Sequence, residues 1–144
     1  ELLDEEGEKM RKEGREFGST TGRPRRCGWL DLPALKYSIM LNGVTQLVMM
    51  KVDVLTIFDE IKVCTHYQLA DGTLTDEMPY DLCDEEVTPV YKTFKGWGTS
   101  LDGMRAYDEI PAELKAYVEY IEQEVHVPVT FISTGPDREA IVLR

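Results

Sequence analysis

Cysteine is scarce in this chain of 144 residues, which contains only Cys27, Cys64 and Cys83. An odd number of cysteines without a Cys-x-x-Cys spacing argues against a disulfide framework and against a zinc site. Reduced thiols in a cytoplasmic protein are the simpler interpretation. Long apolar runs are also missing, because none approaches the roughly 18 residues that predict a membrane-spanning helix. We therefore expect a cytoplasmic location and no membrane partner.

Positive charge is in deficit. The chain has 16 Lys and Arg residues against 27 Asp and Glu residues, which gives a formal net charge of -11 at pH 7. Such a field repels nucleic acids and anionic membranes, so we expect no nucleic-acid partner. The length and a hydrophobic content of 42% suit one domain with a real core. Any anionic ligand must be bound by a local cluster of basic and polar groups.

One dense cluster of that kind lies in residues 18–29, GSTTGRPRRCGW, here called the arginine loop. It places three arginines and three hydroxyl side chains between glycines. The planar guanidinium matches the paired oxygens of carboxylates and phosphates, and hydroxyls with free backbone N–H groups complete an anion cradle. The loop therefore predicts an anion-binding site. The alternative is a solvated basic loop paired with the surrounding acidic side chains.

The helices follow from charge pattern and apolar spacing. Residues 1–17 alternate charges with few apolar side chains, which predicts a solvated helical lead-in. Residues 30–41 predict a helix with Asp31 as N-cap and Asn42-Gly43 at its end. Residues 111–125 carry an apolar stripe at helical spacing and predict an amphipathic helix.

The strands are of two kinds. Residues 44–50 are a short apolar run, which predicts a buried strand of a parallel sheet that is covered on both faces, and residues 127–132 predict a second buried strand. Residues 60–69 and 87–94 predict an antiparallel pair, with Cys64 on the exposed face of the first strand and Pro89 marking the second as an edge strand. With a last strand at 140–143, the prediction is an α/β fold: part of a larger, mostly parallel sheet with flanking helices, as in P-loop NTPases, plus a small antiparallel β appendage.

Polar loops follow the two buried strands. Ligands of open α/β sheets bind outside the carboxyl ends of the strands. A carboxylate at Asp53 can accept hydrogen bonds from both N–H groups of guanine, which adenine lacks, and the stem of Lys51 can lie along a purine ring. The turn at Ser133, Thr134 and Gly135 offers backbone groups to a purine edge or a ribose. The alternatives are a solvated strand end and an ordinary turn.

These loops together resemble the adenylosuccinate synthetase family. The matching strings are residues 18–31, 51–55, 59–64, 89–91 with Gly96-Trp97, and 132–138. They run in the family's order and cover nearly the whole chain after the first helix. The resemblance implies a GTP-dependent, Mg²⁺-requiring ligase, typically a homodimer, that joins IMP and L-aspartate to give adenylosuccinate, GDP and phosphate in AMP biosynthesis. In that reaction GTP phosphorylates the 6-oxygen of IMP, and the aspartate amine then displaces the phosphate.

The resemblance also implies roles for individual residues. The expected aspartate and IMP loop is Ser19, Thr20, Thr21, Gly22, Arg23, Pro24 and Arg25. The expected GTP site is Arg25, Lys51, Val52, Asp53, Ser133, Thr134 and Gly135. Arg23 would lie between aspartate and IMP, and Arg25 would reach the GTP side. Met50 departs from the threonine that the family usually has before this lysine, which puts a hydroxyl contact in doubt.

The family's phosphate loop, its magnesium-binding catalytic Asp and its catalytic His lie near the N-terminus of the full protein, and no residue here matches them. His66 and His126 match no catalytic position. Because the chain starts at Glu1 and stops at Arg144, we expect a C-terminal fragment in which residues 18–144 form the binding part. We expect no catalytic or metal-binding residue and no ligase activity from these residues alone. The alternative is a non-catalytic module that binds a guanine nucleotide or a protein, favoured if no phosphate loop lies upstream.

Overall fold

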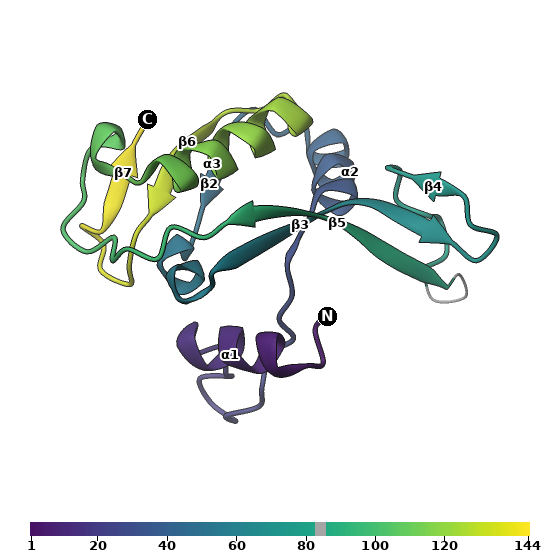
Figure 1. Cartoon of the computed structure of the whole chain (residues 1–144), viewed down its shortest axis with the longest axis horizontal. Helices are drawn as coiled ribbons and strands as arrows, with labels where there is room; N and C mark the ends of the chain where they lie inside the picture. The colour runs from purple at the N-terminus through teal and green to yellow at the C-terminus, as the bar shows by residue number, and fades with distance from the viewer. Residues whose placement is uncertain (83–85) are drawn as a thin grey trace.

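The computed structural model describes residues 1–82 and 86–144. Its helices are α1 (Glu5–Glu13), α2 (Leu32–Asn42) and α3 (Ala112–Val125), with short 3-10 helices η1 (Val52–Ile57) and η2 (Tyr107–Glu109). Its strands are β1 (Leu30–Asp31), β2 (Leu47–Met49), β3 (Glu60–Leu69), β4 (Leu74–Thr75), β5 (Val87–Lys95), β6 (Val129–Ser133) and β7 (Ile141–Leu143). Helices are interspersed with strands that form mixed sheets (Figure 1), so the predicted α/β class is confirmed.

One sheet has the strand order β2-β6-β7. β2 and β6 are parallel, with Met49 opposite Ile132, and β7 is antiparallel to β6. The parallel pair matters for function because it brings the carboxyl ends of two strands to the same edge. α3 lies over this sheet (Figure 1), and its buried stripe includes Leu114, Val118 and Ile121 as predicted.

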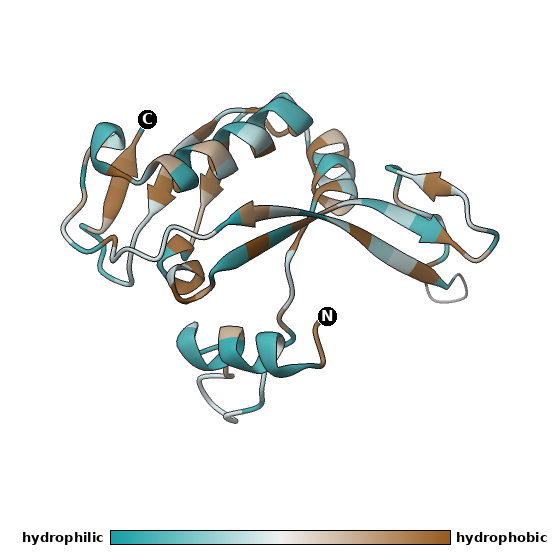
Figure 2. Ribbon diagram, viewed as in Figure 1, coloured by the Kyte–Doolittle hydropathy of each residue, from teal (hydrophilic) through white to brown (hydrophobic). Residues whose placement is uncertain are grey.

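The predicted burial of the strand at residues 44–50, which is β2, on both faces is wrong. β2 is only three residues long, and Val48 keeps 56% of its surface exposed. Phe131 in β6 is 39% exposed. Within the described residues α3 covers one face of the sheet, while side chains of the other face meet solvent. Figure 2 shows β2, β6 and β7 largely in brown, the colour of apolar residues. Some of these apolar side chains, such as Val48 and Phe131, are exposed.

A second sheet is built around β3. β1 pairs with it in parallel and β4 and β5 pair with it antiparallel, so the predicted antiparallel appendage is confirmed. Gly72 has φ +87° in the turn between β3 and β4, a conformation that glycine adopts without strain. Among the described strands β5 pairs only with β3, so Pro89 lies on an edge strand as predicted. The long β3–β5 ribbon reaches away from α3 in Figure 1.

The expected position of Cys64 on the exposed face of β3 is wrong. The register with β5 shifts between Cys64 and His66, so that Thr65 is an extra residue on β3. This bulge breaks the simple alternation of faces. Val63 and Cys64 both precede the bulge and are both buried, so both faces of β3 are covered at this point.

α2 begins and ends where its capping residues predict. The Asp31 carboxylate accepts a hydrogen bond of 3.1 Å from the Ala34 N–H, which satisfies one of the free donors of the first turn. Gly43 takes the left-handed conformation with φ +59° and stops the helix. Leu32 at the start of α2 is completely buried.

α1 is a short charged helix that packs beside η1 (Figure 1). Its outward side is hydrophilic (Figure 2), but Met10 is buried in the core, and Lys9 donates a 2.8 Å hydrogen bond to the Ile57 carbonyl. The lead-in is therefore attached to the rest of the protein along one side. None of the helices in the described part of the chain has the length and apolar content needed to cross a membrane.

Candidate functional site

The arginine loop is closed at its base and exposed at its tip. Phe17 and Pro24 form an antiparallel bridge, and the Gly18 N–H donates a 2.8 Å hydrogen bond to the Arg23 carbonyl. Gly22 closes the turn with φ +65°. Residues 19–26 are all exposed, so the hydroxyl groups and guanidinium groups of the predicted anion site face solvent.

Glu16, two residues before the arginine loop, is held by the end of α1. The N–H of Glu16 donates to the Arg11 carbonyl (2.9 Å) and the N–H of Arg15 donates to the Lys12 carbonyl (3.1 Å). This is the Schellman pattern of a helix C-terminus, with Arg15 at the left-handed position, φ +50°. The motif fixes the backbone at Glu16 and thereby the direction of its side chain.

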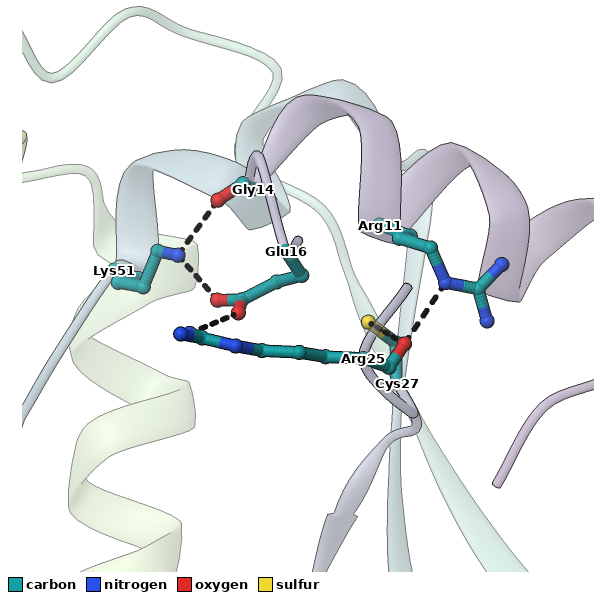
Figure 3. A network of polar contacts seen from close by, with 6 residues as sticks. All are labelled: Arg11, Gly14, Glu16, Arg25, Cys27 and Lys51. Atoms are coloured by element: carbon teal, nitrogen blue, oxygen red, sulfur yellow. Dashed lines mark hydrogen bonds and ion pairs between the residues drawn. The ribbon is translucent and has the colours of Figure 1, made fainter. Parts of the chain in front are cut away.

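Glu16 joins the arginine loop to the turn after β2 (Figure 3). One carboxylate oxygen pairs with the Lys51 ammonium, and the other accepts a 3.1 Å hydrogen bond from the Arg25 guanidinium. Lys51 also donates to the Gly14 carbonyl at 2.7 Å, and Arg25 N–H donates to the Glu16 carbonyl at 2.9 Å. Two of the predicted loops therefore meet at one carboxylate.

Electrostatics at Glu16 follow from these partners. The hydrogen bond from Lys51, together with that from Arg25, lowers the pKa of Glu16 below its ordinary value of 4.5, although partial burial acts in the opposite direction. The carboxylate is therefore charged at neutral pH and pairs with both cations. Beside it is a surface hollow of about 380 Å³, lined by α1, the arginine loop and the turn from Met50 to Leu55.

The third predicted loop lies at the adjacent strand end. Because Met49 of β2 faces Ile132 of β6, the turn that starts at Lys51 and the turn that starts at Ser133 leave the sheet side by side. The Ser133 hydroxyl donates to the Gly135 carbonyl at 3.1 Å, and the Thr134 N–H donates to the Ala140 carbonyl at 2.9 Å. These bonds keep the turn tight.

Two buried polar atoms without a hydrogen-bond partner lie at these strand ends. Among the described residues, the buried side-chain atoms without a hydrogen-bond partner are Trp29 Nε1, Asp53 Oδ1 and Thr134 Oγ1. Buried polar groups are nearly always paired, because leaving one unpaired costs about 1–3 kcal/mol. Asp53 and Thr134 belong to the two neighbouring turns, so their free hydrogen-bonding capacity points to a ligand with polar edges.

The two histidines lie apart from this site, whereas Met50 borders it. His66 is exposed on β3, with Nδ1 3.1 Å from the Thr65 hydroxyl, and His126 is the left-handed residue that ends α3. Met50 is 63% exposed and lines the hollow beside Lys51.

The sequence profile of one family, adenylosuccinate synthetase, matches residues 1–142. The chain belongs to the adenylosuccinate synthetase family. It is 56% identical over 144 residues to the adenylosuccinate synthetase of Cytophaga hutchinsonii, covering 100% of this chain and 33% of that protein. It is 54% identical over 144 residues to that of Flavobacterium johnsoniae, covering 34% of it. The resemblance read from the sequence is thus confirmed.

A solved adenylosuccinate synthetase has the same fold. The structure of the fully ligated enzyme from Plasmodium falciparum matches with a TM-score of 0.93 and 34% sequence identity, over 99% of this chain and 35% of that chain. The chain therefore spans about a third of the length of the synthetases that it matches.

Glu16 is the residue that sequence reasoning missed. In the sequence it is one acidic residue among the alternating charges of residues 1–17, where a solvated role is the ordinary interpretation. Its partner Lys51 is 35 positions away, so no local spacing indicates the pair. The only available signal is its place two residues before the arginine loop.

Proposed function

We propose that this chain is the C-terminal, aspartate- and guanine-binding part of a GTP-dependent ligase that joins IMP and L-aspartate to form adenylosuccinate. Residues 18–144 carry the binding loops, and residues 1–17 lead into them. The longer protein acts in AMP biosynthesis in the cytoplasm and is expected to be a homodimer. Membership of the synthetase family supports the reaction class.

The observation that carries the proposal is the meeting of the polar turns after β2 and β6. Their neighbouring positions and the unpaired atoms Asp53 Oδ1 and Thr134 Oγ1 suit a bound purine nucleoside. The Asp53 carboxylate would accept the N–H groups of guanine, and a base without that donor pair would leave it unpaired. Lys51 would lay its stem along the ring while its ammonium stays on Glu16.

The arginine loop would receive the anionic amino acid. The hydroxyls and N–H groups of Ser19, Thr20 and Thr21 would bind the aspartate carboxylates, with Arg23 placed between aspartate and IMP. Arg25, whose backbone is held by Glu16, would reach the GTP side. In this scheme the chain binds and orients the reactants, while the phosphate loop and the catalytic Asp and His belong to the remaining two-thirds of the synthetase.

Magnesium does not fit the described residues. No group of three or more His, Cys, Asp or Glu side chains in residues 1–82 and 86–144 is arranged to hold a metal ion. We therefore place the Mg²⁺ that supports GTP chemistry elsewhere in the synthetase and assign no step to it here.

The decisive experiment is Asp53→Asn in the full-length synthetase that contains these residues. Loss of a charged hydrogen-bond acceptor should raise the KM for GTP about tenfold or more and reduce the preference for GTP over ITP and ATP. Asp102→Asn makes the same change on an exposed loop and should leave both quantities as they are. An Asp53→Asn enzyme with the wild-type nucleotide preference contradicts the assignment of the guanine carboxylate.

The inactivity of the isolated chain is tested separately. The purified 144-residue chain should give no adenylosuccinate from IMP, aspartate and GTP. Any turnover above that of a buffer blank would overturn this expectation. Calorimetric titration of the chain with GTP then reports how much of the binding site it retains.

A further inference from the structure

Glu16 lies where two binding loops meet, although neither loop contains it. Its carboxylate touches Lys51, which follows β2, and Arg25, which belongs to the arginine loop (Figure 3). These partners are 35 and 9 positions away in the sequence. The fold has therefore brought together residues of three separate segments around one negative charge.

The position of this carboxylate is set by backbone contacts. The Schellman end of α1 fixes Glu16, and its carbonyl accepts the Arg25 N–H at 2.9 Å. The Gly14 carbonyl accepts a second bond from the Lys51 ammonium at 2.7 Å. Arg11 Nε donates to the Arg25 carbonyl at 2.8 Å, so α1 holds the base of the arginine loop at several points.

Exposure differs between the three side chains. Glu16 is 23% exposed, whereas Lys51 is 47% and Arg25 is 60% exposed. The anion is thus the more enclosed partner, and all three residues line the hollow of about 380 Å³. Such a geometry orients both cations without covering them, which leaves their outer surfaces free for a ligand.

We propose that Glu16 is a positioning residue of the synthetase, which aligns Lys51 of the guanine turn and Arg25 of the arginine loop for their ligands. This inference rests on the proposed function, because it takes the ligands of the two loops from it. Glu16 touches neither ligand in this scheme and acts through the two cations. One carboxylate would then influence the binding of both GTP and aspartate.

The test compares Glu16→Gln with Glu13→Gln in the full-length synthetase. Both changes remove one negative charge near the end of α1, but Glu13 is exposed and lies outside this network. Removing two partly exposed ion pairs should raise the KM for GTP and the KM for aspartate by about fivefold each, with kcat changed less than about twofold. Glu13→Gln should leave both KM values within about twofold of the wild type.

A mutant cycle with Lys51→Met and Arg25→Met separates positioning from a general structural effect. If Glu16 acts on GTP only through these two cations, Glu16→Gln should no longer raise the KM for GTP when both are already replaced. A fivefold effect that persists in the Lys51→Met, Arg25→Met background overturns the proposal. Glu16→Asp keeps the charge but shortens the side chain by one methylene, so it should also raise the KM for GTP and the KM for aspartate. This variant replaces Glu16→Gln in the test if Glu16→Gln does not fold.

Failure of this inference is distinct from failure of the proposed function. A wild-type synthetase that forms no adenylosuccinate refutes the function itself. An active wild type whose Glu16→Gln variant keeps both KM values refutes only the role of Glu16.

Discussion

The Tyr67 hydroxyl of β3 donates a 2.6 Å hydrogen bond to Asp31 Oδ2, while Oδ1 of the same carboxylate caps α2. One side chain thus ends a strand, starts a helix and is held by the neighbouring strand. Burial raises the pKa of Tyr67, and the hydrogen bond to Asp31 raises it further, so the phenol stays a donor. This bond anchors the segment that leads out of the arginine loop.

Tyr67→Phe should destabilise the protein by about 1–2 kcal/mol, because it leaves a part-buried carboxylate without its charge-assisted donor. Urea unfolding followed by circular dichroism measures the change. Tyr91→Phe, on the partner strand β5, is the matched control and should cost less than about 0.5 kcal/mol. Equal losses in the two variants would contradict a special role of the Tyr67–Asp31 bond.

Arg15→Gly should stabilise the protein by about 0.5–1 kcal/mol, because Arg15 has φ +50° and glycine adopts this conformation without a Cβ clash. Arg15→Ala removes the same charged side chain but keeps the Cβ, so it should give no such gain. The measurement is the free energy of unfolding of both variants. If alanine stabilises as much as glycine, backbone strain is not the reason.

Stability should depend on pH through Glu16. Its folded-state pKa is lowered below 4.5 chiefly by Lys51, so its contribution is fully present above that value and is lost as the pH falls through the folded pKa. The difference in Tm between the wild type and Glu16→Gln should therefore shrink between about pH 6 and about pH 3. A difference that stays constant over this range would show that the charge of Glu16 contributes nothing.

Arg23→Leu in the full-length synthetase should mainly raise the KM for aspartate, by about tenfold, since it removes a charged donor for a carboxylate. The KM for GTP should change little. Arg105→Leu, on an exposed loop between β5 and η2, is the control. An unchanged KM for aspartate would remove Arg23 from the proposed aspartate site.

The Cys64 thiol should react slowly with alkylating reagents in the folded protein. Burial, and to a lesser degree the Asp31 charge, raises its pKa to about 11. In a Cys27→Ser, Cys83→Ser variant, iodoacetamide at about pH 8 should modify the folded protein about a hundredfold more slowly than the urea-unfolded protein. Equal rates would show that Cys64 is accessible in the folded state.

The local parts of this fold were predictable because their causes lie within a few residues. Asp31 and Gly43 bracket α2, and each acts on backbone groups at most four positions away. The strand pattern placed β3 and β5 correctly as an antiparallel pair. The bulge at Thr65 was not predictable, since it depends on the register with a strand more than twenty positions further on.

The amino-acid sequence by itself determined the helix caps, the composition of the arginine loop and the family of this protein, because these reside in contiguous residues. Only the tertiary structure decided that Glu16 bridges Lys51 and Arg25, that Tyr67 holds Asp31, and that β2 keeps an uncovered face. The physical reason is distance along the chain. The type of a charged or hydroxyl side chain limits the kinds of group that it can bind. Which group it binds depends on the packing that brings remote segments together.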